Sequence, residues 1–212
     1  MIQLVTSIVC LVLVALFGLH VYKHASAPAN IMIQQIEYIR KENFDSLVSN
    51  HQPIVVRKVD EQLPMLYLPH TETDPVNPVS YVSSLHSRVS FNHKFALADK
   101  FRNIYTTHHD RTFIIQLKSE TIVRLYPPSQ KSLLYCRIRT NGYDVSSANV
   151  KDPNVHKKFP LLHKSKFISV RLKKGNMLFV PSLWSFYMED STNSAVSTSS
   201  TIASEFVYRF VI

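Results

Sequence analysis

Residues 168–190 constrain the fold of this chain more than any other segment. Residues 168–173 alternate apolar and polar side chains, with the period of two that is typical of a strand buried on one face. Residues 174–176, Lys-Gly-Asn, favour a tight turn, because Gly and Asn tolerate positive φ. Residues 177–180 are apolar and end at Pro181, since proline cannot donate to a sheet ladder. The pattern predicts a β-hairpin followed by an aromatic-rich segment.

Similar strand patterns recur through the rest of the chain. Residues 112–117 and 121–126 are predicted strands joined by a turn at 118–120, and Asn141-Gly142 marks another turn. Many short strands with frequent turns indicate a mostly β sandwich or barrel. The remaining predictions are strands at 53–57, 63–68 and 201–212, a short strand or turn at 133–138, mixed segments at 79–85 and 91–104, a loop at 71–78, an exposed Ser/Thr/Asn-rich segment at 190–200, and an amphipathic helix at 31–48 packed on the core.

Residues 2–22 contain no Asp, Glu, Lys or Arg and are dominated by Leu, Val, Ile and Phe. About 20 helical residues span a hydrocarbon core of about 30 Å. We therefore predict a transmembrane anchor over residues 1–24, contacting the lipid bilayer through residues 2–22, and a linker over 25–30. A cleaved signal peptide is the alternative, because residues 25–27 form an Ala-Ser-Ala sequence. The missing basic n-region and the following Pro28 favour a retained signal-anchor.

The positive charges nearest this span predict its orientation. Lys23, Arg40 and Lys41 all follow the apolar run, and nothing basic precedes it. Because cytoplasmic flanks carry an excess of Lys and Arg, we expect a single-pass membrane protein with its C-terminal domain in the cytosol.

Charge and cysteine content exclude several functions. The formal net charge is +9, but the basic residues are dispersed, so no nucleic-acid partner is expected. The chain has only 3 Gly and no phosphate-binding Gly-rich motif. Its two cysteines, Cys10 and Cys136, form no CxxC pair, which removes the ligands for a zinc finger or a thioredoxin-like site.

Three stretches, in this order, resemble the cupin-like, JmjC-related branch of the cupin superfamily, which includes Fe(II)/2-oxoglutarate hydroxylases. They are residues 51–57 (HQPIVVR), residues 113–128 with their two terminal prolines, and residues 175–184 (GNMLFVPSLW). The resemblance implies a double-stranded β-helix, a cupin or jelly-roll barrel with flanking helices, over residues 31–212.

The family's chemistry needs two His and one carboxylate around iron. The resemblance places two of these ligands at His108 and Asp110. An alignment without a gap places Thr106 and His108 there instead and loses the carboxylate. The third ligand position is Phe186, whose ring has no lone pair for a metal. A distant residue such as His163 is a possible substitute.

Two further family positions have changed: Thr121 replaces the lysine that pairs with the keto acid, and Asn176 replaces an acid in the turn. We therefore expect no catalytic residues and no cofactor, and we interpret the domain as a pseudoenzyme. We expect it to act as a membrane-anchored binding or scaffold module with a protein partner. Such a module would suit, for example, a virion or host membrane. Two alternatives stay open: an Fe(II)/2-oxoglutarate hydroxylase with rearranged ligands, and a secreted or lumenal binding domain after signal cleavage.

Aromatic and basic side chains supply the other candidates for ligand binding. Trp184, Phe186 and Tyr187 are expected at the barrel mouth, where they either stack a ligand or close the core; the second is the simpler interpretation because aromatic residues bury large areas. Arg124 and Arg171 either line an anion cleft or are solvated on the polar faces of their strands.

Overall fold

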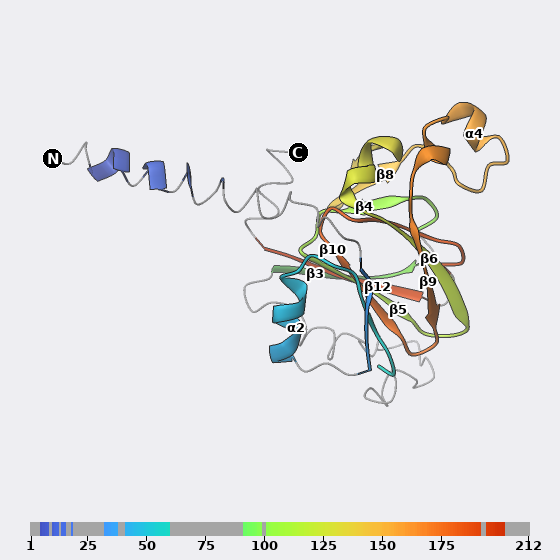
Figure 1. Ribbon diagram of the computed structural model, residues 1–212, viewed down its shortest axis with the longest axis horizontal. Helices are drawn as coiled ribbons and strands as arrows, with labels where there is room; N and C mark the ends of the chain where they lie inside the picture. The colour runs from blue at the N-terminus through green and yellow to red at the C-terminus, as the bar shows by residue number, and fades with distance from the viewer. Residues whose placement is uncertain are drawn as a thin grey trace, which may run out of the picture.

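The structure, a computed structural model, describes residues 5–8, 10–12, 14–15, 18, 32–37, 41–59, 91–98, 101–191 and 194–201 of the chain. These residues form a mostly β structure of two six-stranded sheets (Figure 1). All strand pairs are antiparallel except β1 with β2. The arrangement is consistent with a cupin sandwich.

The first sheet has the strand order β1-β2-β10-β5-β12-β3 and the second has the order β7-β8-β4-β11-β6-β9. The strands of the first sheet are β1 (Gln34–Ile36), β2 (Ile54–Val56), β3 (Phe91–Leu97), β5 (Arg111–Gln116), β10 (Met177–Pro181) and β12 (Ser194–Ser200). The strands of the second are β4 (Tyr105–Thr107), β6 (Glu120–Tyr126), β7 (Cys136–Thr140), β8 (Tyr143–Ser146), β9 (Ile168–Lys173) and β11 (Ser185–Met188). The described residues from 32 onward also form α2 (Lys41–Val48), α4 (Val155–Lys158) and the 3-10 turns η4 (Pro128–Leu133) and η5 (Leu162–Lys164).

Three apolar clusters hold these layers together. The interior cluster lies between the sheets and includes Ile114 and Leu178 from the first sheet and Leu125 and Phe186 from the second. A second cluster packs α2 on the outer face of the first sheet, and a third covers the outer face of the second sheet with η4, α4 and η5. Each sheet is therefore buried on both faces near its centre.

The strands predicted at residues 168–173 and 177–180 are confirmed, but the predicted hairpin between them is wrong. β9 pairs with β6 in the second sheet, whereas β10 pairs with β2 and β5 in the first. The turn at Gly175, with φ of 75°, carries the chain from one sheet to the other. The predicted strands at 112–117 and 121–126 likewise form as β5 and β6, in opposite sheets. Periodicity identifies a strand, but not which strand it pairs with.

Two other predictions are wrong for related reasons. The helix predicted over residues 31–48 is replaced near its start by β1, which pairs in parallel with β2, and among the described residues of this range only α2 is helical. The segment predicted to be exposed at 190–200 contains β12, every residue of which is buried between β5 and β3. β12 pairs on both sides, with β5 and with β3, so its backbone is satisfied by neighbouring strands although its side chains are mostly Ser and Thr.

Other predicted elements have mixed outcomes. The strand at 53–57 is confirmed as β2, and Asn141-Gly142 joins the true hairpin β7–β8. Residues 133–138 divide between η4 and β7, and the mixed segment at 91–104 contains β3. The predictions at 25–30, 63–68, 71–78, 79–85 and 202–212 lie outside the described residues. Within the described part of the chain, no helix is long and apolar enough to cross a membrane.

Candidate functional site

The connection from β4 to β5 directs successive side chains to opposite faces of the second sheet. Tyr105 contacts the interior cluster, whereas Thr106 pairs through its hydroxyl with Ser185 Oγ at 2.7 Å. The alternation follows from the period of two in a strand. It continues to His108, which lies on the same face as Thr106.

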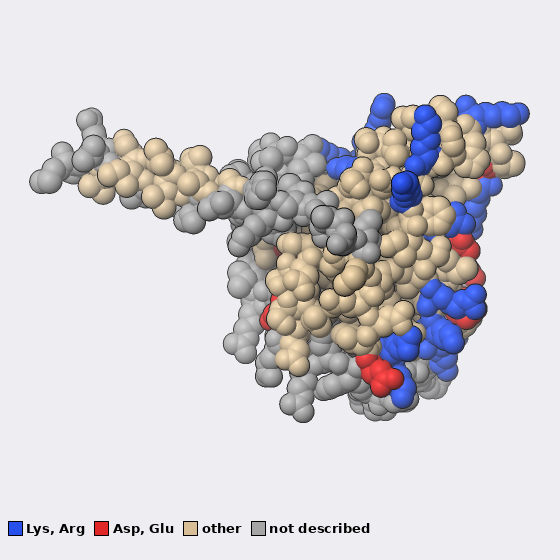
Figure 2. All heavy atoms as spheres, in the orientation of Figure 1, with Lys and Arg blue, Asp and Glu red and all other residues tan. Residues whose placement is uncertain are grey.

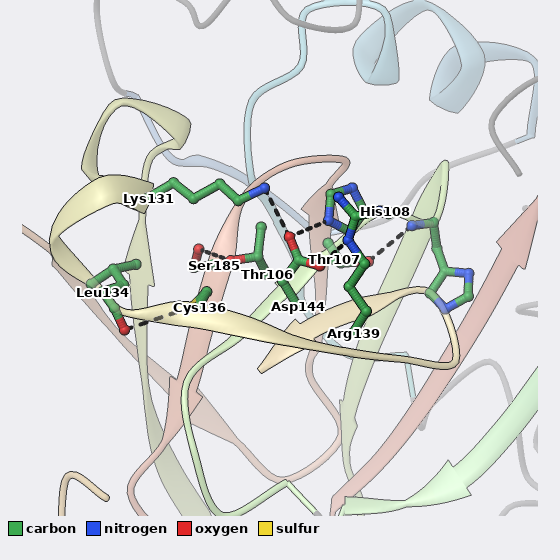
Figure 3. Close-up of polar contacts among 10 residues, drawn as sticks. Thr106, Thr107, His108, Lys131, Leu134, Cys136, Arg139, Asp144 and Ser185 are labelled. Carbon is green, nitrogen blue, oxygen red and sulfur yellow. Dashed lines mark hydrogen bonds and ion pairs between the residues drawn. The ribbon is translucent and has the colours of Figure 1, made fainter. Parts of the chain in front are cut away.

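His108 is part of a buried ionic network on that face (Figure 3). Its Nε2 lies 2.9 Å from Asp144 Oδ2, and because an ionised carboxylate only accepts, Nε2 is the donor. Lys131 Nζ, from η4, lies 2.8 Å from the same oxygen, and Arg139 Nε lies 3.8 Å from Oδ1. Asp144 is thus contacted by basic side chains from three separate segments of the chain.

Burial alone would raise the pKa of Asp144. The hydrogen bonds and charges of His108 and Lys131 outweigh this effect and hold the pKa at about 2. Asp144 is therefore ionised at neutral pH. The Asn141-Gly142 turn explains its placement, since this turn sets the hairpin register that puts Asp144 opposite Thr106.

Asp110, the other predicted metal ligand, contacts a different part of the molecule. Its Oδ2 accepts a hydrogen bond of 2.6 Å from the backbone N–H of Thr201, just after β12. The structure thus directs His108 to Asp144 and Asp110 to the end of β12.

His109, between them, has the more complete set of contacts. Its Nε2 donates to the Asn141 carbonyl at 3.0 Å and its Nδ1 pairs with Ser200 Oγ at 2.7 Å. Its ring also packs edge-on against Tyr143, with centroids 4.9 Å apart. His109 therefore ties the β7–β8 hairpin to the end of β12.

Phe186 occupies the interior face, where the family's third ligand is expected. Its ring centroid lies 5.7 Å from that of Phe101, 6.1 Å from that of Tyr105 and 6.3 Å from that of Tyr143. We call these four residues the interior aromatic cluster. Burial raises the pKa of Tyr105 and of Tyr143, so both phenols stay neutral and pack as aromatic residues.

The three aromatic residues predicted at the barrel mouth divide between the two faces of the second sheet. Trp184 and Phe186 belong to the interior cluster, and Trp184 Nε1 donates to the His51 carbonyl at 3.2 Å. Tyr187 lies on the outer face, with Tyr126 and Leu134. They do not form one continuous stacking surface.

The remaining candidate residues from the sequence lie outside the interior aromatic cluster and the contacts of His108. His163 is exposed in η5, and Thr121 Oγ1 donates to the Asp190 carbonyl at 2.6 Å. The interpretation of Arg124 as simply solvated is wrong, because its Nη2 pairs with Glu189 Oε1 at 2.6 Å and its guanidinium lies 5.0 Å from the ring centroid of Phe167. Arg171 is exposed and lies 3.8 Å from Glu120.

The described residues do not fit an iron site of the family's kind. They contain no group of three His, Cys, Asp or Glu side chains that could hold a metal ion. His108 and Phe186 lie on opposite faces of the same sheet, so even an imidazole at position 186 would not complete a site with His108.

Sequence reasoning missed Asp144 and Lys131, the partners of His108. The only signal was the turn at Asn141-Gly142, which predicts a hairpin but not the strand beside it. A pairing between residues so distant in the chain has no local pattern.

Two β-sheets enclosing an apolar interior make this domain a β-sandwich, consistent with the cupin class. The cupin-like domain family matches residues 100–209, more than half of the 212-residue chain. The chain belongs to this family.

Proposed function

We propose that this chain is a non-catalytic cupin-like domain that acts as a binding or scaffold module, held at a membrane by residues 2–22. We also interpret its strands, which alternate between the sheets from β3 to β6 and from β9 to β12, as the double-stranded β-helix of the cupin superfamily. The observation that carries the proposal is the packing of Phe186 into the interior aromatic cluster.

An Fe(II)/2-oxoglutarate enzyme needs three ligands around one ion, with open positions beside it. Here the rings of Phe101, Tyr105, Tyr143 and Phe186 fill that side of the interior, and Phe186 is completely buried. The polar side chains nearby are engaged elsewhere, His108 with Asp144 and His109 with Ser200. This arrangement supports a structural role for the positions that would hold iron in the hydroxylases that this chain resembles.

Metal analysis of the full-length chain tests the absence of catalysis. After incubation with Fe(II) and removal of unbound metal, we expect well below one equivalent of iron, no conversion of 2-oxoglutarate to succinate, and no change in either result for His108→Ala. His156→Ala, an exposed histidine on α4, is the matched control. One equivalent of iron, lost in His108→Ala but kept in His156→Ala, would establish the hydroxylase alternative.

The exposed N-terminal side chains support the membrane part of the proposal. The described residues between 5 and 18 are helical, and Leu11 and Val14 are 71% and 70% exposed. Apolar side chains left in water are unfavourable by about 25 cal/mol per Å². A bilayer would remove this cost.

Membrane extraction of the expressed chain tests the anchor. We expect the chain to stay with membranes at alkaline pH and its domain to be digested by protease added from the cytosolic side. A mature N-terminus beginning after Ala27 would instead establish the secreted or lumenal alternative.

A further inference from the structure

The sandwich has an open end where the edge of one sheet faces the edge of the other. Among the described residues, β9 pairs only with β6 in the second sheet, and β1 is the edge strand of the first sheet, next to β2. A pocket of about 490 Å³ lies between these edges. Ile33, Val55 and Val170 line it, and each belongs to or packs against the interior cluster. The apolar interior of the sandwich therefore reaches the pocket.

The pocket follows the edge of β9 and is not confined to one of its faces. Its lining includes Ser169, Val170 and Arg171 in succession. Successive residues of a strand point to opposite faces of the sheet, so one surface can touch all three only along the edge of the strand. Val170 and Leu172 are buried on the inner face. Ser169, Arg171 and Lys173 are exposed on the outer face.

The backbone of β9 directs hydrogen-bonding groups away from β6. Ile122 of β6 lies opposite Arg171, but its carbonyl accepts from the backbone N–H of Glu189, on the β11 side, at 3.0 Å. In an antiparallel pair a residue either exchanges both of its backbone bonds with the residue opposite or exchanges neither. The N–H and C=O groups of Arg171, and of Ser169 two positions earlier, therefore point away from β6. Such groups at a sheet edge are a template for a further strand.

The outer face at this edge favours an acidic neighbour. Glu120 of β6 lies opposite Lys173 and 3.8 Å from Arg171, and the pair that it forms with Arg171 is mostly exposed. Because an exposed ion pair contributes little, this carboxylate does not prevent the two cations from pairing across the other side of β9. Figure 2 shows Lys and Arg gathered on the side of the molecule where β6 and β9 lie in Figure 1. Opposite charges directly across two strands are stabilising, and like charges are destabilising.

We propose that β9 pairs in antiparallel orientation with an extended segment of a partner protein, in which acidic residues alternate with apolar ones. The acidic side chains lie beside Arg171 and Lys173 on the outer face, and the apolar side chains enter the pocket beside Val170. Main-chain hydrogen bonds supply affinity in strand addition of this kind, and the alternate side chains supply specificity. A second copy of this chain is a poorer partner, because β9 against β9 brings Arg171 and Lys173 of the two copies together.

This inference rests on the proposed binding function and names the chemistry of its protein partner. It involves no residue of the interior aromatic cluster and none of the contacts of His108. The iron measurement and the peptide measurements below can therefore fail separately.

Anisotropy of a fluorescent peptide, titrated with the full-length chain in non-ionic detergent, tests the pairing. The probe alternates glutamate with valine over 6 residues, the length of β9. We expect saturable binding. Peptides with serine in place of valine, or lysine in place of glutamate, should bind at least about 10-fold more weakly, because the first leaves the pocket empty and the second brings like charges together. Equal binding of the three peptides, or no binding of the probe, would overturn the proposal.

Methylated forms of the same probe test the backbone bonds. In antiparallel pairing the residues opposite Arg171 and Ser169 are glutamates, and their amides donate to β9. N-methyl groups on the glutamate amides should abolish binding, whereas N-methyl groups on the valine amides, which point away from β9, should leave it. The two peptides have the same charge and composition. Equal binding of both, or a loss confined to the valine-methylated peptide, would overturn the antiparallel pairing.

Charge-reversal variants locate the binding on β9. Arg171→Glu with Lys173→Glu should weaken binding of the glutamate probe by at least about 10-fold and strengthen binding of the lysine peptide, since the attractive and repulsive pairs exchange. Lys157→Glu with Lys164→Glu changes the net charge equally at two exposed positions outside the pocket and should change either affinity by less than about 2-fold. Equal effects in the two double variants, or no gain for the lysine peptide, would overturn the site.

Sedimentation of the chain with and without the glutamate probe tests the other occupant of this edge. We expect the chain's oligomeric state in detergent to be the same in both samples. A dimer that the probe dissociates would show that a second copy occupies β9, and would overturn the acidic partner.

Discussion

Phe186 lies directly opposite Tyr105 in the register between β11 and β4, and their rings stack at an angle of 25°. The two side chains therefore point into the space between the sheets, while their neighbours Ser185 and Thr106 bond on the other face. A phenylalanine that stacks in this way contributes to the core of the domain.

Phe186→Ala should destabilise the domain by about 3–5 kcal/mol, because it leaves a cavity among packed rings at a fully buried position. The free energy of unfolding in urea measures the loss. Phe167→Ala, the same change at a side chain 44% exposed, should cost about 1 kcal/mol and serves as the control. Equal losses in the two variants would show that Phe186 is not part of the core.

Asp144→Asn should destabilise the domain by about 2 kcal/mol at neutral pH, in keeping with a pKa lowered from 3.8 to about 2. A carboxyl group with a lowered pKa stabilises the fold above its unfolded pKa and loses this contribution as the pH falls. The effect should therefore be full above about pH 4 and disappear towards pH 2.

Urea unfolding of wild type and Asp144→Asn across this pH range measures the difference. Asp152→Asn is the control, since Asp152 pairs with Lys158 at the surface, where water screens the interaction. A constant difference between wild type and Asp144→Asn from neutral pH to pH 2 would contradict the ionic role of Asp144.

Gly142→Ala should destabilise the β7–β8 hairpin by about 2–3 kcal/mol. Gly142 has a φ of +82°, and an added Cβ would lie 2.5 Å from His109 Cε1. Asn141→Ala, at a φ of 48° in the same turn, should cost only about 1 kcal/mol, because it introduces the strain of positive φ without that clash. Thermal unfolding compares them, and an equal loss would mean that His109 moves aside freely.

Arg124→Lys should cost about 1 kcal/mol. Nε and Nη2 of Arg124 donate to Glu189 Oε1 at 2.9 and 2.6 Å, and its planar group also lies over Phe167 and Tyr187. A lysine ammonium cannot reproduce the paired donors or the stacking. Arg137→Lys, on an exposed position of β7, is the control and should leave the unfolding midpoint unchanged.

Local patterns predicted the strands of this domain far better than the pairs they form. Alternation identified β9 and a continuous apolar run identified β10, and β5 and β6 were recognised as two strands joined by a turn, because each strand must bury at least one face wherever it lies. The same pattern cannot choose a sheet, so short turns that connect two sheets were taken for hairpin turns. β12 was missed because buried Ser and Thr have no apolar signal.

The candidate site shows the same division. The residue type alone identified Phe186 as a residue that cannot bind a metal, and the family resemblance associated His108 with Asp110 as metal ligands. The structure associates His108 with Asp144, which is 36 residues away in sequence.

The sequence by itself determined the mostly β class and the chemistry of each side chain, because both depend on local periodicity and residue type. Tertiary structure alone decided which face each side chain occupies and which distant residue it contacts. The physical reason is that sheet pairing joins segments that are far apart in the chain. A shift of the pairing register by one residue moves every side chain of a strand to the opposite face, and the register depends on packing across the whole sandwich.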